Sequence, residues 1–264
     1  MGVVISVATN KGGVGKTSLI TNLACVVAKE NKKKRILIID VDGQSNCALA
    51  FNINPANIEH SIYDVMMGKK SAKDVIMKLD KNIDLLPSND EMDFLEFDVL
   101  PNLKELGNPF RLLVDRFDGI HEEYDYIFID TPPSIGLVTG NVLAASDHVL
   151  IPLMPELYAV RGFLRMISVI KQIKDDENPQ LDISGIIPMM VDSRTTLHSQ
   201  MLQEARRICY EKELPMFETV IPKSIQFSNS TAYEGKPAVL TYPKHKVVKA
   251  YYKLYQEFKA EGIL

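Results

Sequence analysis

Short apolar runs rich in β-branched residues recur along the chain, and helix-like stretches separate them. The seven runs are residues 3–8, 35–40, 83–87, 126–130, 148–153, 183–191 and 217–221. Runs that are apolar at nearly every position are typical of strands covered on both faces. Their alternation with helices predicts an α/β fold: a mostly parallel, twisted β-sheet flanked by helices on both faces.

No internal repeat, low-complexity linker or break in composition divides the chain, so we expect residues 1–264 to form a single domain. Residues 17–29 carry apolar positions at helical spacing and predict a helix directly after the first loop. Residues 52–80 and 91–123 are more polar. We expect them to form surface helices and loops around the edge of the sheet where a ligand would bind.

Composition narrows the class of protein further. The chain has 264 residues, 46% hydrophobic and 24% charged, and a net charge of −4, so any nucleic-acid binding would need a local basic patch. Cys25, Cys47 and Cys209 show no metal-ligand spacing and predict small core residues in a reducing cytosol. We see no signal peptide and no bilayer-length apolar stretch, and therefore expect a soluble, cytoplasmic protein.

The segment NKGGVGKTS at residues 10–18 follows the first predicted strand and opens the first predicted helix. Phosphate binding requires backbone N–H groups near anionic oxygens, and glycines permit that approach. Lys16 adds a charge for the β- and γ-phosphates, and the Thr17 hydroxyl can ligate Mg²⁺. A ligand-free glycine turn is the alternative, but the strand–loop–helix context favours a phosphate site. Its predicted cofactor-binding residues are Lys11, Gly12, Gly13, Val14, Gly15, Lys16, Thr17 and Ser18.

Three motifs together resemble one family. KGGVGKTS looks like the deviant Walker A loop of the ParA/MinD ATPases, and residues 40–46 (DVDGQSN) are similar to the ParA pattern DxDPQxN. Residues 130–134 (DTPPS) resemble that family's Walker B segment. Residues 191–195 and 219–222 also resemble ParA/Soj proteins, so the similarity covers essentially the whole chain.

The resemblance implies a role for each charged residue. Lys11 would contact the nucleotide of the opposite subunit in a dimer, and Lys16 would act on its own subunit's nucleotide. Asp40 resembles the carboxylate that orients the attacking water, so Lys11, Lys16 and Asp40 are the predicted catalytic residues. Asp42 is equally well explained as a strand-end cap.

The same resemblance assigns cofactors. Thr17 and Asp130 would hold Mg²⁺, and Pro222 would contact the adenine of ATP. Two positions depart from the usual patterns: Asn10 stands where a glycine is common, and Gly43 replaces the family's proline. We expect Gly43 to loosen the turn that follows the second strand.

For function, the resemblance implies a partition ATPase that hydrolyses ATP slowly, as a switch. The ATP-bound homodimer would bind nucleoid DNA non-specifically, and a ParB-like partner would stimulate hydrolysis. No helix-turn-helix segment precedes the first strand, so we expect no operator recognition by this chain alone. A MinD-like, membrane-associated positioning ATPase and an ATPase regulator of the same fold are the alternatives.

The C-terminal residues 246–261 bear on that choice. An apolar stripe at helical spacing predicts a helix that docks on the sheet rather than on a membrane. Exposed lysines there would form a salt-sensitive, phosphate-contacting patch, although a merely solvated face is the alternative. Gln226 stands where ParA proteins commonly carry arginine, which weakens the DNA assignment. The DNA-binding candidates are Lys223, Lys236, Lys244, Lys246, Lys249 and Lys253, with His245 beside them.

Overall fold

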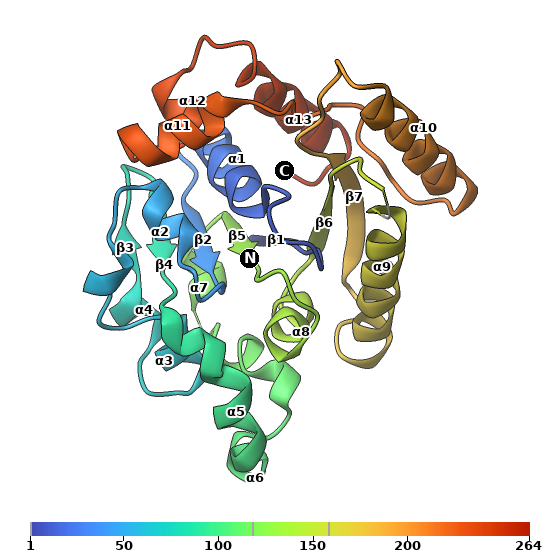
Figure 1. Ribbon diagram of the computed structural model, residues 1–264. Coiled ribbons are helices and arrows are strands. Elements are labelled where there is room, and N and C mark those ends of the chain that lie inside the picture. The colour runs from blue at the N-terminus through green and yellow to red at the C-terminus, as the bar shows by residue number, and fades with distance from the viewer. Residues whose placement is uncertain (1, 118, 158) are drawn as a thin grey trace.

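Seven strands form one sheet in the computed structural model, which describes residues 2–117, 119–157 and 159–264 (Figure 1). The strand order is β3-β4-β2-β5-β1-β6-β7, and only the β3–β4 pair is antiparallel. The predicted α/β class and mostly parallel sheet are confirmed. The strands are β1 Val3–Val7, β2 Ile36–Asp40, β3 Met77–Lys78, β4 Ile83–Leu86, β5 Tyr126–Asp130, β6 His148–Leu153 and β7 Asp182–Pro188.

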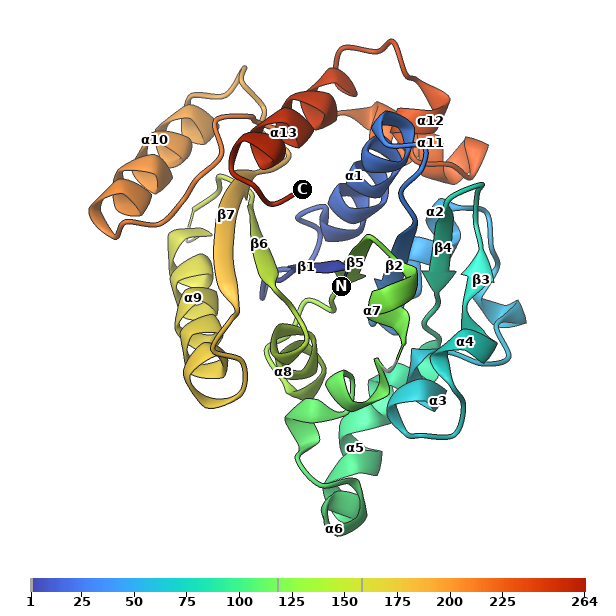
Figure 2. The same cartoon turned by 180° about the vertical axis from the view of Figure 1, so that it is seen from behind.

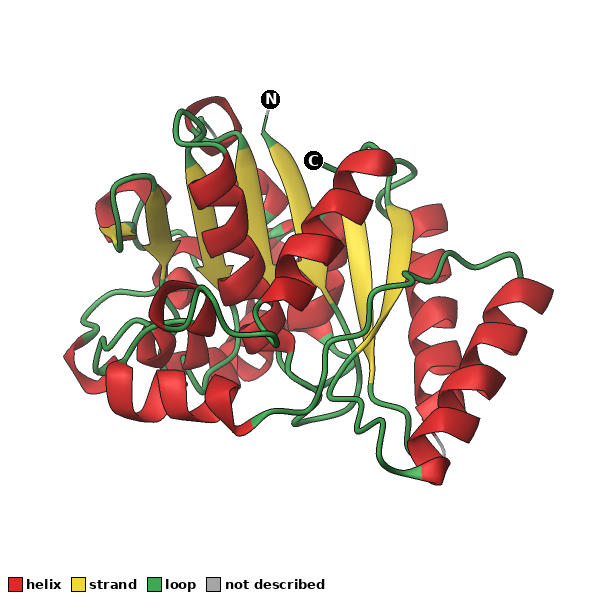
Figure 3. Ribbon diagram, turned by 90° about the horizontal axis from the view of Figure 1, so that it is seen from above, coloured by secondary structure: helices red, strands yellow, loops and turns green. Residues whose placement is uncertain are grey.

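Helices lie on both faces of this sheet, as the turned view shows (Figure 3). Five short 3₁₀ segments, at Pro55–Asn57, Asp90–Phe94, Leu100–Asn102, Pro109–Arg111 and Val114–Arg116, interrupt the connections. The α-helices are α1 Lys16–Glu30, α2 Asn46–Ala50, α3 Ile62–Met66, α4 Ala72–Val75, α5 Leu95–Val99, α6 Leu103–Leu106, α7 Ile120–Glu123, α8 Leu137–Ala144, α9 Ala159–Asp176, α10 Thr196–Glu211, α11 Ile225–Glu234, α12 Ala238–Thr241 and α13 Lys249–Ala260.

Alternate side chains of each central strand enter different apolar clusters, because successive residues of a strand point to opposite faces. Ile5 packs into the cluster that contains α1 and α13, whereas Val4 packs into the cluster that contains α3 and α5. A third cluster joins β6 and β7 to α9 and α10. Both faces of the central strands are therefore covered, which explains why their sequences are apolar throughout.

Two expectations drawn from the sequence are wrong in detail. Residues 217–221 form no named strand: the segment runs beside β7 and its extension through the isolated bridges Ile186↔Met216 and Val191↔Pro222. Residues 52–80 and 91–123 also do more than cover the surface. They contain β3 and several short helices, and residues such as Ile62 and Leu95 are fully buried beneath the sheet. Helices of one turn are too short to show a periodic pattern.

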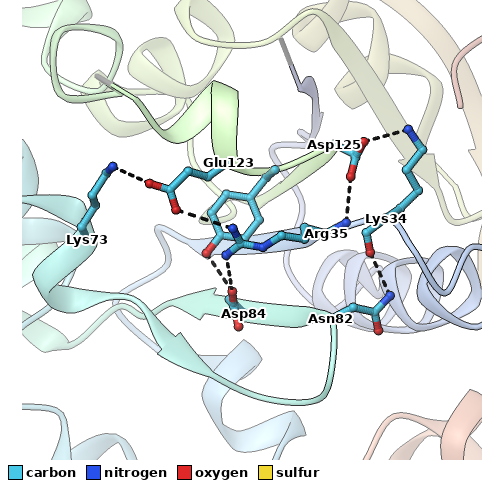
Figure 4. Close-up of polar contacts among 8 residues, drawn as sticks. Lys34, Arg35, Lys73, Asn82, Asp84, Glu123 and Asp125 are labelled. Carbon is cyan, nitrogen blue, oxygen red and sulfur yellow. Dashed lines mark hydrogen bonds and ion pairs between the residues drawn. The ribbon is translucent and has the colours of Figure 1, made fainter.

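Ion pairs connect neighbouring segments at the rim where β2 and β5 begin (Figure 4). Lys34 donates to Asp125 at 2.7 Å, and the Arg35 guanidinium lies 3.4 Å from Asp84 and 3.6 Å from Glu123. These lysine and arginine side chains are about half exposed, so each pair contributes little to stability. The opposite rim, where β2 and β5 end, is free to carry the site.

Candidate functional site

The three sequence motifs meet because of the strand order. β5 lies between β1 and β2, and the register pairs Asp130 with Val7 on one side and with Asp40 on the other. The loop after β1, the turn after β2 and the turn after β5 therefore leave the sheet side by side. In open parallel sheets this carboxyl edge is where ligands bind.

The loop between β1 and α1 has the backbone geometry of an anion cradle. Gly13 and Gly15 adopt left-handed conformations, with φ of 70° and 87°, which residues with a Cβ rarely adopt. Gly15 directly precedes α1, so the helix N-terminus and its free N–H groups face the loop.

A cavity of about 430 Å³ opens beside this loop. One wall comes from the loop and the start of α1, the other from the turn after β2 and from Met189, Met190 and Ile221. Seven of the nine predicted cofactor-binding residues line the cavity, and Lys11 and Pro222 do not: the seven are Gly12, Gly13, Val14, Gly15, Lys16, Thr17 and Ser18. Tyr251 of α13 reaches the same cavity and its hydroxyl lies 3.3 Å from that of Ser18.

Asp130 lies in direct contact with Thr17, which lines the cavity. The Thr17 hydroxyl donates to Oδ2 of Asp130, and Oδ1 of Asp130 is buried with no hydrogen-bond partner among the described residues. Burial raises the pKa of Asp130 to about 6, against the opposing effect of the Thr17 hydrogen bond and the Lys16 charge. A hydroxyl and an unsatisfied carboxylate oxygen are a donor set that fits Mg²⁺.

The two aspartates after β2 differ in what they face. Both Asp40 oxygens accept backbone hydrogen bonds, from the N–H of Asp42 at 3.0 Å and of Cys47 at 2.9 Å. Burial, and then the nearby Asp130 charge, raise the pKa of Asp40. Asp42, in contrast, lines the cavity. The structure therefore does not bring Asp40 to the ligand space, and Asp42 is the carboxylate that sequence reasoning undervalued.

Cys47 is a second residue that sequence reasoning missed. All three cysteines are buried free thiols, as predicted, but the Cys47 sulfur lies 3.7 Å from Oδ2 of Asp130. One donor atom each from Asp40, Cys47 and Asp130 lies within 4.8 Å of the others. Burial raises the pKa of the Cys47 thiol, so it remains a neutral neighbour of the two carboxylates. No local spacing signalled this contact, because it depends on strand order.

The two loop lysines take different directions. Lys16 is buried at the cavity, and burial lowers its pKa while Asp130 and Asp42 oppose that shift. Lys11 points away and forms an ion pair with Glu156, which lies between β6 and α9. The Lys11–Glu156 pair is partly exposed, and Lys11 lines a separate hollow with Asn10. Lys11 therefore does not contact the cavity of its own chain.

Hydrogen bonds hold the turn after β2 in place. The Ser45 hydroxyl donates to the Ser88 carbonyl at 2.9 Å, and the Asp42 carboxylate accepts the Gln44 N–H at 3.1 Å. A Cβ on Gly43 would overlap the Asp93 carboxylate. Glycine at this position thus permits close packing against residues 90–94, contrary to the expected loosening.

The remaining predicted contacts lie outside the main cavity. Pro222 pairs with Val191 and lines a second hollow of about 690 Å³, whereas its neighbour Ile221 lines the cavity itself. Lys223 and Lys246 also line this second hollow. All six lysines proposed for DNA contact are exposed: Lys223, Lys236, Lys244, Lys246, Lys249 and Lys253.

The C-terminal helix docks as expected, although it spans Lys249–Ala260 and not 246–261. The predicted apolar stripe is buried against α1 and the sheet: Tyr251, Leu254, Tyr255 and Phe258 belong to the helix, and Val247 lies just before it. Among the described residues, no helix combines the length and apolar character needed to cross a bilayer.

Comparison with known proteins agrees with this geometry. The family model described as an AAA domain matches residues 2–183. The sporulation initiation inhibitor protein Soj of Bacillus subtilis is 32% identical over 263 residues, 99% of this chain and 100% of that protein. The chromosome partitioning protein ParA of Myxococcus xanthus is 33% identical over 258 residues, 97% of this chain and 88% of that protein.

A solved structure extends the likeness to three dimensions. Cobyrinic acid a,c-diamide synthase from Mycobacterium smegmatis, crystallised with an ATP analog and magnesium, superposes with a TM-score of 0.82 at 26% identity. The match covers 96% of this chain and 92% of that one.

Proposed function

Since this chain belongs to the ParA/Soj family of P-loop ATPases, we propose that it is a partition ATPase. ATP binding would drive a homodimer, the dimer would bind DNA without sequence preference, and slow hydrolysis would release it. The single observation that supports this most strongly is the convergence of three motifs at one cavity. Beside it, the Thr17 hydroxyl donates to one oxygen of Asp130, and the other oxygen of that carboxylate has no partner among the described residues.

We assign the chemistry to residues that line or adjoin the cavity. The loop N–H groups and Lys16 bind the phosphates of ATP, and Thr17 and Asp130 hold Mg²⁺. The metal, when bound, neutralises charge on the β- and γ-phosphates. Asp42 orients the attacking water. Asp40 positions Asp42, because its carboxylate accepts the Asp42 backbone N–H.

The proposed homodimer gives Lys11 a catalytic role. Phosphoryl transfer needs extra positive charge as the transition state develops, and Lys11 cannot supply it from its present pairing with Glu156. We propose that dimerisation exchanges this ion pair for a contact with the nucleotide of the partner subunit. The role first assigned to Lys11 therefore stays a prediction about the assembled protein.

The DNA surface is proposed from charge and exposure. Lys223 and Lys246 border one hollow together with Arg194, and Lys249 and Lys253 project from the outer side of α13. Such contacts reach phosphates and would weaken steeply as salt rises. Specific recognition and stimulation of hydrolysis would come from a ParB-like partner, and the ATP state would be nucleoid-associated.

DNA retention measured with ATP, with ADP and without nucleotide, at two salt concentrations, tests the proposal. We expect retention only with ATP, and loss at the higher salt. The Lys16→Ala protein serves as the nucleotide-free control. Equal retention in all three conditions would refute an ATP-controlled DNA switch.

Two comparisons separate the remaining assignments. Asp42→Asn should leave an ATP-locked dimer, whereas Asp40→Asn should slow turnover only through the displaced turn. Equal turnover by Asp42→Asn and the wild type would remove Asp42 from catalysis.

Sedimentation with liposomes and ATP tests the MinD-like alternative. The burial of the α13 apolar stripe argues against it, and ATP-dependent sedimentation would overturn our choice.

A further inference from the structure

A sulfur atom and two carboxylates meet in the interior, next to the cavity. Asp40 ends β2 and Asp130 ends β5, and these strands lie side by side with α2 close to β2 (Figures 1 and 2). Cys47 belongs to the first turn of α2. One donor atom from each of the three residues lies within 4.8 Å of the others, and all three side chains are fully buried. We call these three residues the buried cluster.

A hydrogen bond from the thiol explains only part of this arrangement. The Cys47 sulfur donates to Oδ2 of Asp130, an oxygen that already accepts the Thr17 hydroxyl. Oδ1 of the same carboxylate has no partner in the described part of the chain, although it is buried. The neighbouring Asp40 adds a second carboxylate at close range. A divalent cation would satisfy the free oxygen and offset both carboxylates at once.

The sulfur changes which cation the buried cluster favours. In tetrahedral zinc sites the Zn–S bond is about 2.3 Å and the Zn–O bond about 2.1 Å, which places sulfur and oxygen about 3.6 Å apart. The Cys47 sulfur lies 3.7 Å from Oδ2 of Asp130, close to that separation. Mg²⁺ prefers oxygen ligands and gains little from a thiol, whereas Zn²⁺ and Cd²⁺ bind thiolate strongly.

We propose that Asp40, Cys47 and Asp130 form a binding site for a thiophilic divalent cation, of which Zn²⁺ is the type. Binding forms a bond between the cation and the Cys47 sulfur, and the thiol proton leaves to solvent. The site goes beyond the proposed function, since the assigned Mg²⁺ ligands do not include Cys47. Both sites require Asp130, so the two cations exclude each other, and the thiophilic cation opposes Mg²⁺-dependent ATP binding.

The surroundings meet two further requirements of a metal site. Hydrogen bonds orient the ligands: both Asp40 oxygens accept backbone N–H groups of the turn after β2, and the Thr17 hydroxyl donates to Asp130. An entry path exists as well, because Thr17 and Asn46 line the cavity. Thr17 contacts Asp130, and Asn46 directly precedes Cys47. A cation that enters the cavity therefore reaches the buried cluster past these two residues.

Cd²⁺ is the probe for the test, because its bond to a thiolate absorbs in the ultraviolet and its bonds to carboxylates do not. We expect this absorption when Cd²⁺ is titrated into the full chain without nucleotide, and its loss in Cys47→Ser. Zn²⁺ affinity, measured against a chromophoric chelator, should fall about a hundredfold in the same variant. The matched control is Cys25→Ala/Cys209→Ala, which keeps Cys47 as its one cysteine and should bind both cations like the wild type.

Competition tests the shared ligand. Excess Mg²⁺ should weaken Zn²⁺ binding to the wild type, and Zn²⁺ should inhibit Mg²⁺-dependent binding of a fluorescent ATP far less in Cys47→Ser. Undiminished cadmium absorption in Cys47→Ser, or its absence from the Cys25→Ala/Cys209→Ala protein, would overturn the proposal. Zn²⁺ affinity that does not respond to Mg²⁺ would overturn the sharing of Asp130.

Failure of this proposal is distinguishable from failure of the proposed function. Mg²⁺-dependent ATP binding by Cys47→Ser shows that the variant is folded, since the Thr17–Asp130 pair does not involve the sulfur. A wild type that binds Mg²⁺ and ATP but shows no cadmium–thiolate absorption would refute only the thiophilic site. ATP-independent DNA retention by the wild type would instead refute the partition mechanism.

Discussion

Replacing Asp130 by asparagine should stabilise the protein without nucleotide and abolish its response to Mg²⁺. Asp130 is fully buried, one of its oxygens has no hydrogen-bond partner among the described residues, and Asp40 lies next to it in the register. A buried carboxylate with these neighbours disfavours its charged form. Asparagine keeps the shape and an acceptor for Thr17 but removes the charge.

The pKa shift gives the magnitude. Burial raises the pKa of Asp130 from 3.8 to about 6. The folded state therefore holds this proton more tightly than the unfolded state, so wild-type stability falls as the pH rises through that window. At about 1.4 kcal/mol for each pKa unit, the loss is about 3 kcal/mol at neutral pH. Asp130→Asn should recover it.

Urea unfolding with EDTA and no nucleotide measures the effect at about pH 7.5 and about pH 5. We expect Asp130→Asn to gain about 3 kcal/mol in free energy of unfolding at the higher pH and about half that at the lower. Asp182→Asn, which changes an exposed carboxylate at the start of β7, should show neither gain.

Addition of Mg²⁺ and ATP should nearly close this gap in stability. The wild type gains about 2.7 kcal/mol at a hundredfold excess over the dissociation constant, whereas the variant should lose the Mg²⁺-dependent part of that gain. Unchanged stability of the variant at both pH values, or an undiminished response to Mg²⁺, would refute the assignment of Asp130 as a strained metal ligand.

Three further outcomes follow from the same contacts. Mg²⁺-dependent ATP binding, measured with a fluorescent nucleotide, should weaken below about pH 6 as Asp130 is protonated; a flat profile to about pH 5 would contradict this. Glu156→Gln should release Lys11 and increase the ATP-dependent dimer fraction several-fold by light scattering, and no increase would show that the pair is not a restraint. Gly43→Ala should displace the exposed Asp93 carboxylate and destabilise the protein by no more than about 1 kcal/mol. Asp93→Ala should rescue it in a double-mutant cycle, and additive effects would exclude that contact.

The sheet and the location of the site could be predicted because both depend on local patterns. Near-continuous apolar runs indicated buried parallel strands, and parallel strands deliver their carboxyl ends to one edge. The strand predicted at residues 217–221 is wrong. Its apolar residues pack against β7, but its backbone pairs there only at isolated bridges. An apolar pattern reports burial and does not report how many backbone hydrogen bonds are made.

Side-chain direction at the site could not be predicted in the same way. Asp40 and Asp42 stand two positions apart; from the sequence, the catalytic role was assigned to Asp40, while Asp42 was equally well explained as a strand-end cap. Their roles diverge because α2 turns back and offers the Cys47 N–H to Asp40, while Asp42 is left at the cavity. The position of Cys47 beside Asp130 could not be predicted for the same reason. Its contact with Asp130 depends on β2 and β5 being neighbours, a fact of topology.

These contacts connect metal binding to the turn after β2. Asp40 lies beside Asp130 and also holds the backbone N–H groups of Asp42 and Cys47. A cation at Asp130 favours ionised carboxylates, and an ionised Asp40 accepts those two hydrogen bonds more strongly. We therefore expect charge at Asp130 to tighten the turn that carries Asp42, where Gly43 packs against Asp93. Metal binding at Asp130 and the conformation of the turn after β2 should therefore depend on each other.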